Sequence, residues 1–316
     1  PGCSRGLARC APRPPSSLRG LPRMASTALF ALALARASLG AVGARMGLIP
    51  QAGHHDSAGS PLLRCAPGVD YLLGEEVGFG RDSIVHAVKP RSSGADPEGV
   101  VVVPEEGALV AKVRKPRAWA DGSPAMEAAR RECRHTNSAA DVPEVNAPRC
   151  HGLCELEPRR PALLLDRVDG LTLAELLSKF SGTMDLSSIV GNVVCPAFLQ
   201  LGAMLRAGCG HYDLHVGNLM LDHAGRLWII DFGGYLCTRG LRCWRHHLGL
   251  MVHGLVASLR LTGQLVHRSV ESDIGPSIRE CFESQLWQRL ECDAAAPLVP
   301  GRDCDIARDA FEVAVT

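Results

Sequence analysis

The chain has 316 residues, of which 46% are hydrophobic and 21% are charged, as in an ordinary globular protein of one large or two small domains. Seven of its 34 Lys and Arg residues lie in the first 55 positions, which hold no acidic residue, so positions 56–316 carry 27 basic and 33 acidic side chains. A mildly acidic body of this kind argues against the basic face that nucleic acid binding needs. We therefore expect no nucleic acid partner.

Residues 1–61 have the composition of a targeting or disordered leader. A start at Met24 would place a short apolar core at Ala28 to Ala35, leading into an A-x-A pattern, as in a signal peptide. An upstream start would instead give an Arg-rich presequence of the organellar type. Arg36 and Arg45 interrupt the apolar run, so we expect no transmembrane segment. The expected destination is the secretory pathway or an organelle, and otherwise the cytoplasm.

The thirteen cysteines lack the paired C-x-x-C spacing of a zinc framework. Cys150 and Cys154 flank a histidine, but no second pair stands at zinc-finger distance from them. We therefore interpret most cysteines as small buried hydrophobic residues. If the leader is secretory, some of them can pair, and their spacing does not indicate which ones.

In chain order, folded structure is expected to begin near Leu62, and strands dominate the first half. A helix is predicted from Pro124 to Asn137, because proline suits the first helical turn. The last strand of this half is buried and ends at Gly170. Strands are predicted at 71–87, where two flank a glycine turn, at 108–113 and at 161–168.

Helices dominate the second half of the chain. Thr172 and Glu175 form a capping box for a short helix, and a longer apolar helix is predicted from Leu186 to Ala207, where a glycine follows. The segments LMLD and LWIID predict two short strands around a turn at 219–231, and a helical pattern resumes at His246. The sequence therefore predicts an α+β fold.

Two local features of the first half suggest phosphate chemistry. Gly78, Gly80 and Ser83 form a GxGxxS turn in which glycines let backbone N–H groups approach phosphates closely. A plain hairpin turn explains the same pattern. Lys112 stands inside an apolar strand, so an inward-facing side chain needs an anionic partner. That partner is a glutamate of the following helix or a nucleotide phosphate, unless the lysine lies on an edge strand and faces solvent.

The segment HYDLHVGNLM supports two interpretations. His211, Asp213 and His215 alternate along it, and on a strand this spacing would gather three metal ligands on one face. Alternatively, Asp213 and Asn218 stand five residues apart on a loop, ahead of a DFG tripeptide. The second interpretation also accounts for the glycine turn and for Lys112, which a metallohydrolase site would leave unexplained.

In their order along the chain, these motifs resemble those of the protein-kinase-like superfamily. HYDLHVGN resembles the kinase catalytic loop HRDxxxxN, and DFG is identical to the kinase metal-binding motif. GxGxxSxV resembles the glycine-rich loop, LVAKV the strand with the phosphate-binding lysine, and DRVDG the hinge. The resemblance covers about residues 70–260. It implies a bilobal fold with a β-rich lobe and hinge at 62–168 and a mainly helical lobe at 169–316.

The resemblance also implies transfer of phosphate from ATP with the help of Mg²⁺. Asp213 would accept or orient the proton of the attacking hydroxyl. Asn218 and Asp231 would hold Mg²⁺, whose preference for oxygen ligands fits an amide and a carboxylate. The remaining residues implied at the nucleotide are Gly78, Gly80 and Ser83 over the phosphates, Val85 on the adenine, and the backbone of Asp166 and Val168 at its edge.

Lys112 would pair with the ATP phosphates and with a carboxylate of the helix predicted at 124–137. Glu127 and Glu132 are five residues apart on that helix and cannot both face the lysine. We favour Glu132 because its distance to the next strand fits the family better.

The departures from protein kinases concern the acceptor. Tyr212 stands where these kinases carry the arginine that binds a phosphorylated activation loop, so regulation of that kind is not expected. His215 replaces the usual lysine, and HxDLHxGN resembles aminoglycoside and choline kinases, whereas GxGxxSxV is typical of protein kinases. The first hypothesis is an atypical Ser/Thr protein kinase. The alternatives are a kinase of a small-molecule hydroxyl and a pseudokinase that binds nucleotide without catalysis.

Overall fold

The computed structural model describes residues 61–65, 69–80, 82–91, 107–115, 122–156, 160–179, 186–209, 211, 213–233, 275–292, 304–305 and 308–309. Residues 1–60 of the predicted leader, Tyr212 and the helical pattern around His246 lie outside these residues. Within the described ranges, no helix combines the length and the hydropathy that crossing a membrane requires.

Six strands of the first half close into a barrel in the order β1-β2-β3-β4-β6-β5, and every pair of neighbours is antiparallel. Apolar side chains such as Leu63, Leu73 and Ala111 form the core of this barrel. The barrel confirms the strands predicted at 71–87 and 108–113. Its strands are β1 (Leu62–Cys65), β2 (Asp70–Phe79), β3 (Ser83–Pro90), β4 (Leu109–Arg114), β5 (Cys150–Leu156) and β6 (Arg160–Asp166).

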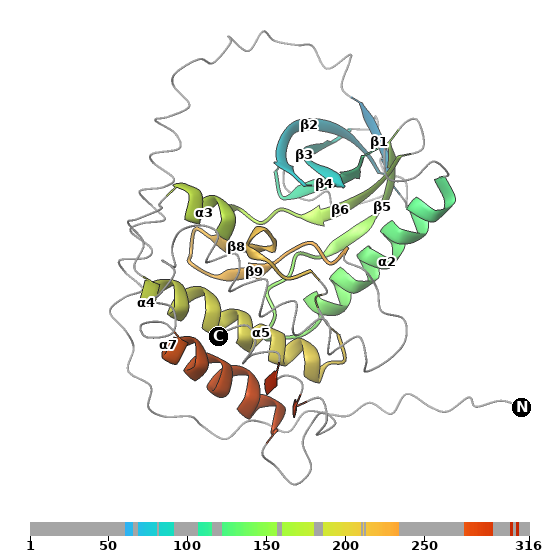
Figure 1. The fold of residues 1–316 in the computed structure, drawn as a ribbon. Coiled ribbons are helices and arrows are strands. Elements are labelled where there is room, and N and C mark those ends of the chain that lie inside the picture. Colours follow the sequence, from blue (N-terminus) through green and yellow to red (C-terminus); the bar gives the residue numbers. More distant parts are fainter. Residues whose placement is uncertain are drawn as a thin grey trace, which may run out of the picture.

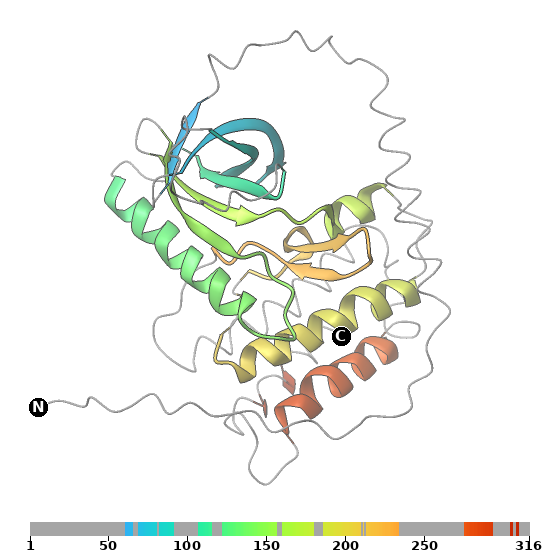
Figure 2. The ribbon, with the colours of Figure 1, turned by 180° about the vertical axis from the view of Figure 1, so that it is seen from behind.

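The helix α2 (Gly122–Ala140) packs along β5 and β6 beside the barrel (Figure 1, and from behind in Figure 2). Ala129 on its inner face is completely buried against Cys150 and Leu163 of the two strands. Asn137 ties the same helix to β5, because its amide donates to Cys150 O and accepts from Cys150 N–H. The helix confirms the one predicted at 124–137, and these contacts fix which of its faces meets the barrel.

The second half combines helices with one small sheet. The sheet has the order β7-β8-β9 and is antiparallel, with strands β7 (Gly170–Thr172), β8 (Leu219–Asp222) and β9 (Leu227–Ile229). The helical segments are α3 (Leu173–Lys179), α4 (Leu186–Ile189), η3 (Val190–Val194), α5 (Cys195–Arg206), η4 (Val216–Asn218), α7 (Gly275–Cys281), η6 (Phe282–Trp287) and η7 (Gln288–Leu290).

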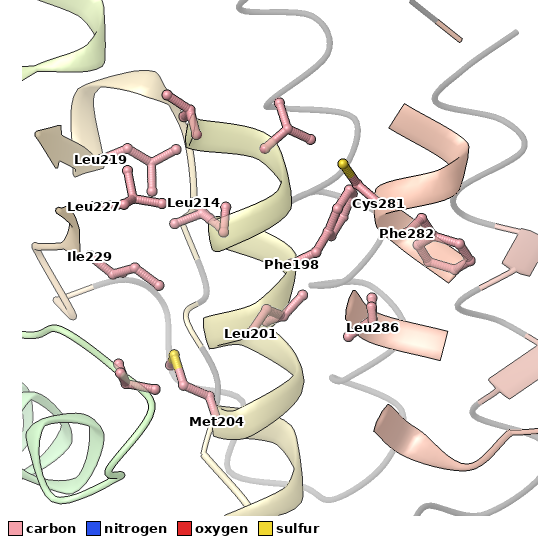
Figure 3. Packing of buried hydrophobic residues seen from close by; sticks show 14 of the residues in the cluster. Phe198, Leu201, Met204, Leu214, Leu219, Leu227, Ile229, Cys281, Phe282 and Leu286 are labelled. Atoms are coloured by element: carbon pink, nitrogen blue, oxygen red, sulfur yellow. The ribbon is translucent and has the colours of Figure 1, made fainter. Parts of the chain in front are cut away.

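A second hydrophobic core lies around α5, which is apolar on most of its surface because it is buried between neighbours. Figure 3 shows Phe198 and Leu201 of α5 between the side chains of β8, β9 and the loop before them and those of α7 and η6. Leu214, which lies next to Asp213 in the chain, packs into this core with 4% of its surface exposed. The core thereby supports the loop that carries the predicted catalytic residues.

The structure confirms the two helix predictions of this region in detail. Thr172 N–H donates to the Glu175 carboxylate (2.8 Å) and Glu175 N–H donates to Thr172 Oγ1 (3.2 Å), which is the predicted capping box. The helix predicted at 186–207 is present, although η3 interrupts it with a π-helical turn. It ends at Arg206, and Gly208 follows with a left-handed φ of 75°.

The prediction of a strand at 161–168 was wrong at its C-terminal boundary. β6 stops at Asp166, and Gly170 begins β7 instead of ending the preceding strand. At Gly170 the backbone of β8 passes so close that an added Cβ would collide with Leu221 O, so the position needs glycine for its space. Val168 therefore lies in a connection between two sheets.

The interpretation of the cysteines as small hydrophobic residues was wrong for eight of the nine that the structure describes. They form the disulfides Cys65–Cys154, Cys133–Cys150, Cys195–Cys281 and Cys292–Cys304, while Cys209 is free. Cys65 and Cys154 face each other on neighbouring strands although they are 89 residues apart in sequence. Spacing along the chain cannot indicate such a pair, because the fold alone brings the two residues together.

Candidate active site

Lys112 lies in the middle of β4, where apolar neighbours point into the barrel and the lysine points toward α2. Its Nζ lies 2.6 Å from Glu132 Oε1 and 2.6 Å from Asp231 Oδ1, with 10% of its side chain exposed. Burial alone would lower the pKa of Lys112, but the charges of Glu132 and Asp231 outweigh burial and hold that pKa above its ordinary value. The lysine is therefore charged at neutral pH and has two anionic partners, as its place in an apolar strand predicted.

Glu132 belongs to the buried face of α2, and 4% of its side chain is exposed. Glu127 lies on the outer face, where it contacts Arg130 and Arg134. Of the two candidate carboxylates, the structure thus brings the favoured one, Glu132, to Lys112. A Cβ added to Gly233 would lie 2.6 Å from Glu132 Oε2, so the DFG glycine leaves the space that this carboxylate occupies.

Asp231 follows β9 with a left-handed φ of 63°, a conformation that Asp tolerates better than most residues. Its Oδ1 accepts hydrogen bonds from Lys112 (2.6 Å) and from Gly233 N–H (3.2 Å). Burial alone would raise the pKa of Asp231, but the charge of Lys112 outweighs it and holds the pKa below its ordinary value. The group is therefore an anionic carboxylate with 41% of its side chain exposed, and it can serve as a ligand for a cation.

His211 is part of the support of the predicted catalytic loop. Its ring packs against Phe232 in an edge-on arrangement with 4.9 Å between centroids. Nε2 lies 2.8 Å from Ile230 O, and Nδ1 accepts from Asp213 N–H at 3.2 Å. Burial holds the pKa of His211 below its ordinary value, so the ring is neutral and donates from Nε2. Both nitrogens are committed, so His211 does not join a metal site with Asp213.

Asn218 is buried at the end of η4, with 6% of its surface exposed. Its amide group donates to Asp213 O (2.7 Å), and its backbone carbonyl accepts from Ile230 N–H (2.9 Å). The hydrogen bond to Asp213 uses the amide nitrogen and leaves the side-chain oxygen to act as a ligand. Asp213, Asn218 and the start of the DFG segment are thereby fixed to one another through the backbone.

Asp213 and His215 are the exposed members of the loop, with 64% and 46% of their side chains accessible. His215 Nδ1 accepts from Gly217 N–H at 3.0 Å, so a neutral ring carries its proton on Nε2. That nitrogen faces Asp213 Oδ2 at 3.8 Å. Among the described residues, no group of three or more His, Cys, Asp or Glu is placed to hold a metal ion. What counts against the metallohydrolase interpretation is the ring of His211, whose two nitrogens both have hydrogen-bond partners.

The predicted glycine-rich loop connects β2 and β3 next to Lys112. Gly78 pairs with Val85, and Val85 pairs with Lys112 across the next strand. Gly80 N–H donates to Ser83 O at 2.9 Å, which closes the turn, and Ser83 is buried. The residues predicted to contact phosphates and adenine therefore belong to the same face of the barrel wall as the lysine or to its immediate neighbours.

Asp166 and Val168, predicted to read the adenine edge, lie at and beyond the end of β6. Asp166 N–H donates to Arg149 O, so only its carbonyl is left for a ligand. The Asp166 carboxylate accepts from Arg149 N–H at 2.8 Å and lies 2.6 Å from His151 Nε2. These contacts hold the connection in place. No sequence motif indicates them, because they depend on the pairing of β5 with β6.

Arg114 is a residue of this site that sequence reasoning missed. Its Nη2 lies 2.7 Å from Glu132 Oε2, with 15% of its side chain exposed. The available signal was its position two residues after Lys112, which puts both side chains on the same face of β4.

Comparisons with known proteins find kinases among those similar to this chain. Residues 123–240 match the family described as the ABC1 atypical kinase-like domain. Two curated relatives, the 3-deoxy-D-manno-octulosonic acid kinases of two strains of Xylella fastidiosa, are each 29% identical over 136 residues, or 41% of this chain and 48% of theirs. The chain thus matches about half the length of these relatives.

Among solved structures, two of the kinase domain of PknI from Mycobacterium tuberculosis are similar, with TM-scores of 0.47 and 0.46. Their sequence identities are 20% and 18%, and the matches cover 80% and 76% of this chain and 98% and 95% of those chains. The family match, the two kinase relatives and the order of the motifs around Lys112 and Asp231 support a place for this chain in the protein-kinase-like superfamily, as an atypical kinase with an α+β fold.

Proposed function

We propose that the chain is a phosphotransferase that uses Mg·ATP and transfers the γ-phosphate to a hydroxyl group. The observation that carries this proposal is the double contact of Lys112, at 2.6 Å to Glu132 and 2.6 Å to Asp231. Three elements meet at this point: β4, the helix α2 that follows it in the chain, and the segment after β9, whose Asp231 is 119 residues from Lys112 in sequence. Phosphoryl transfer depends mainly on positioning and charge neutralisation, and a fixed lysine beside an anionic ligand supplies the parts for both.

The residues present fit a bound Mg²⁺. Asp231 is an anionic carboxylate, and Asn218 has a free amide oxygen because its nitrogen is bonded to Asp213 O. Both are oxygen ligands of the kind that Mg²⁺ prefers. When bound there, the ion would neutralise charge on the phosphates. Lys112 would add its own positive charge to the same group.

Asp213 is the group that would accept or orient the proton of the acceptor hydroxyl. Its carboxylate is exposed to an incoming substrate, while its backbone is held by Asn218 through O and by His211 through N–H. A base that is fixed at the backbone and free at the side chain suits proton transfer from an external hydroxyl.

The acceptor that we favour first is the Ser or Thr hydroxyl of a protein, because GxGxxSxV is typical of protein kinases. A specific observation supports a second candidate, the hydroxyl of a small molecule. The curated relatives are kinases of a sugar acid, and the HxDLHxGN pattern with His215 resembles small-molecule kinases. The two candidates share the same chemistry and differ in what approaches Asp213.

Phosphate transfer from ATP by the full chain tests the proposal, with a general Ser/Thr protein substrate beside 3-deoxy-D-manno-octulosonic acid, an aminoglycoside and choline as acceptors. Asp213→Asn is expected to lower turnover by about 10²–10⁴-fold, the range for loss of a general base. Lys112→Met is expected to remove transfer as well. Asp141→Asn is the matched control, because Asp141 has the same exposed fraction of 64% and lies outside the site.

Equal turnover in all four proteins would contradict the proposal. Stabilisation of the wild type by Mg·ATP in a thermal melt without transfer to any acceptor would instead identify a nucleotide-binding pseudokinase.

A further inference from the structure

The carboxylate of Glu132 is held by two cations. Lys112 Nζ lies 2.6 Å from Oε1, and Arg114 Nη2 lies 2.7 Å from Oε2. The two cations stand two residues apart on β4, so they project from the same face of the strand. Arg114 pairs with Ser83 across β3 and β4, and Lys112 pairs with Val85, so this face continues toward the glycine-rich loop.

The two cations differ in what else they contact. Lys112 divides its charge between Glu132 and Asp231, and it is the residue that would also meet the phosphates. The guanidinium of Arg114 instead contacts the second carboxylate oxygen of Glu132, Oε2. A guanidinium stays protonated in proteins and holds a carboxylate through a planar, directional fork. The ion pair of Arg114 with Glu132 therefore does not depend on whether a nucleotide is bound.

We propose that Arg114 is a positioning residue that keeps Glu132 and α2 docked on the barrel while Lys112 is engaged by nucleotide. This inference rests on the proposed function, because only a bound phosphate would compete with Glu132 for the lysine. When the phosphates draw the charge of Lys112 away, the buried carboxylate would lose part of its compensation. Arg114 supplies what is lost, so α2 stays in place and Lys112 keeps its orientation.

Hydrogen exchange of α2 in the full chain tests this proposal without relying on activity. The variants are Arg114→Met, Arg114→Lys, Lys112→Met and the double variant Lys112→Met with Arg114→Met. Arg130→Met is the control, because Arg130 is an exposed cation of the same helix that contacts Glu127. The probe is the magnesium complex of a non-hydrolysable ATP analogue, and the amides followed are those of residues 125–137.

Without nucleotide, Lys112→Met alone is expected to change α2 exchange by less than about twofold, because Arg114 still holds Glu132. The double variant is expected to exchange at least about tenfold faster, because the buried carboxylate then has no cation. With saturating nucleotide, Arg114→Met is expected to exchange several-fold faster than without it, on the order of fivefold. The wild type and Arg130→Met are expected to show no such increase.

The increase on nucleotide binding is the decisive signature, since a merely structural arginine would loosen α2 to the same extent in both states. Arg114→Lys is expected to restore part of the protection, because it keeps the charge and loses the fork. In turnover, Arg114→Met is expected to lower kcat by about tenfold with a smaller change in KM for ATP, as for a group that orients the lysine. Exchange of Arg114→Met equal to that of Arg130→Met, with and without nucleotide, would overturn the proposal.

The same data separate the two levels of inference. In one outcome, the double variant exchanges faster in α2, but the nucleotide analogue neither binds nor changes exchange in any variant. The proposed function then fails together with the nucleotide-dependent role of Arg114, and only the joint contact of Lys112 and Arg114 with Glu132 is supported. If the analogue binds and phosphate is transferred while Arg114→Met behaves like the control, the proposed function stands and the role of Arg114 fails.

Discussion

On the proposed nucleotide side of the candidate site, Lys112, Arg114 and Glu132 are joined by contacts of 2.6–2.7 Å and are at least 85% buried, whereas Asp213 and His215 on the proposed acceptor side lie 3.8 Å apart and are largely exposed. The nucleotide side is thus fixed before any ligand arrives, as electrostatic catalysis requires. The acceptor side holds its backbone firmly and leaves its side chains open. This difference explains why the geometry favours one class of reaction and leaves more than one acceptor to be tested.

The largest expected effect is a difference in the free energy of unfolding between a variant of the nucleotide side and one of the acceptor side. Glu132→Ala is expected to lower the free energy of unfolding by about 3 kcal/mol, because removing one partner leaves Arg114 and Lys112 with less compensation in a buried place. Asp213→Ala is expected to change it by less than about 0.5 kcal/mol, as for an exposed side chain. Denaturant unfolding of the two variants measures the difference. Similar losses in both would remove the distinction between the sides.

A covalent link strengthens the nucleotide side, since Cys133 follows Glu132 on α2 and forms a disulfide with Cys150 of β5. Replacing both cysteines by Ala is expected to cost about 3 kcal/mol of unfolding free energy, from the loop that the bond closes. The pair Cys292–Cys304, with a separation of 12 residues instead of 17, is the matched control and is expected to cost a similar amount. Only loss of the first pair should speed hydrogen exchange in α2. Faster exchange there in both variants would mean that the link acts on the whole fold.

Space at the DFG glycine gives a smaller effect. Gly233→Ala would put a Cβ 2.6 Å from Glu132 Oε2. This overpacking is expected to lower the free energy of unfolding by about 1–3 kcal/mol and to weaken the ion pair between Glu132 and Lys112. Gly191→Ala is the control, because an added Cβ meets nothing within 4 Å in that helical turn, and it is expected to stabilise by about 0.4–1 kcal/mol. Thermal melts with and without Mg·ATP follow both changes. An unchanged Gly233→Ala protein would show that Glu132 can move aside freely.

The comparison of the two sides also explains what the sequence could predict. Lys112, Asp231 and the predicted catalytic loop carry motifs that are local in sequence. Helical geometry excluded that both Glu127 and Glu132 face the lysine, and the distance to the next strand, compared with that in the family, favoured Glu132. Arg114 carries no such motif, because an arginine at the end of a strand reads like any surface cation until α2 is placed against it. The disulfides and the contacts of Asp166 with Arg149 and His151 depend on how separate elements pack and in which register they pair, which single-sequence patterns do not contain.

The smallest expected effect concerns His215. It tests whether a change on the acceptor side leaves the binding of ATP unchanged. Its ring accepts from Gly217 N–H at 3.0 Å and packs so closely on Gly217 that an added Cβ there would lie 2.9 Å from the ring. Loss of a capping acceptor of this kind costs about 1 kcal/mol, or about fivefold in the balance between ordered and open loop. His215→Ala is therefore expected to lower transfer to the acceptor by about that factor.

His215→Asn keeps an acceptor for Gly217 N–H and is expected to retain the loop, so a difference between the two variants isolates the capping contact. In both variants KM for ATP should stay within about twofold of the wild type, because Lys112, Arg114 and Glu132 are untouched. Steady-state kinetics with each substrate varied in turn provide the measurement. A rise of KM for ATP together with the loss of transfer would contradict this independence. It would mean that replacing the exposed His215 also disturbs the contacts of the buried Lys112.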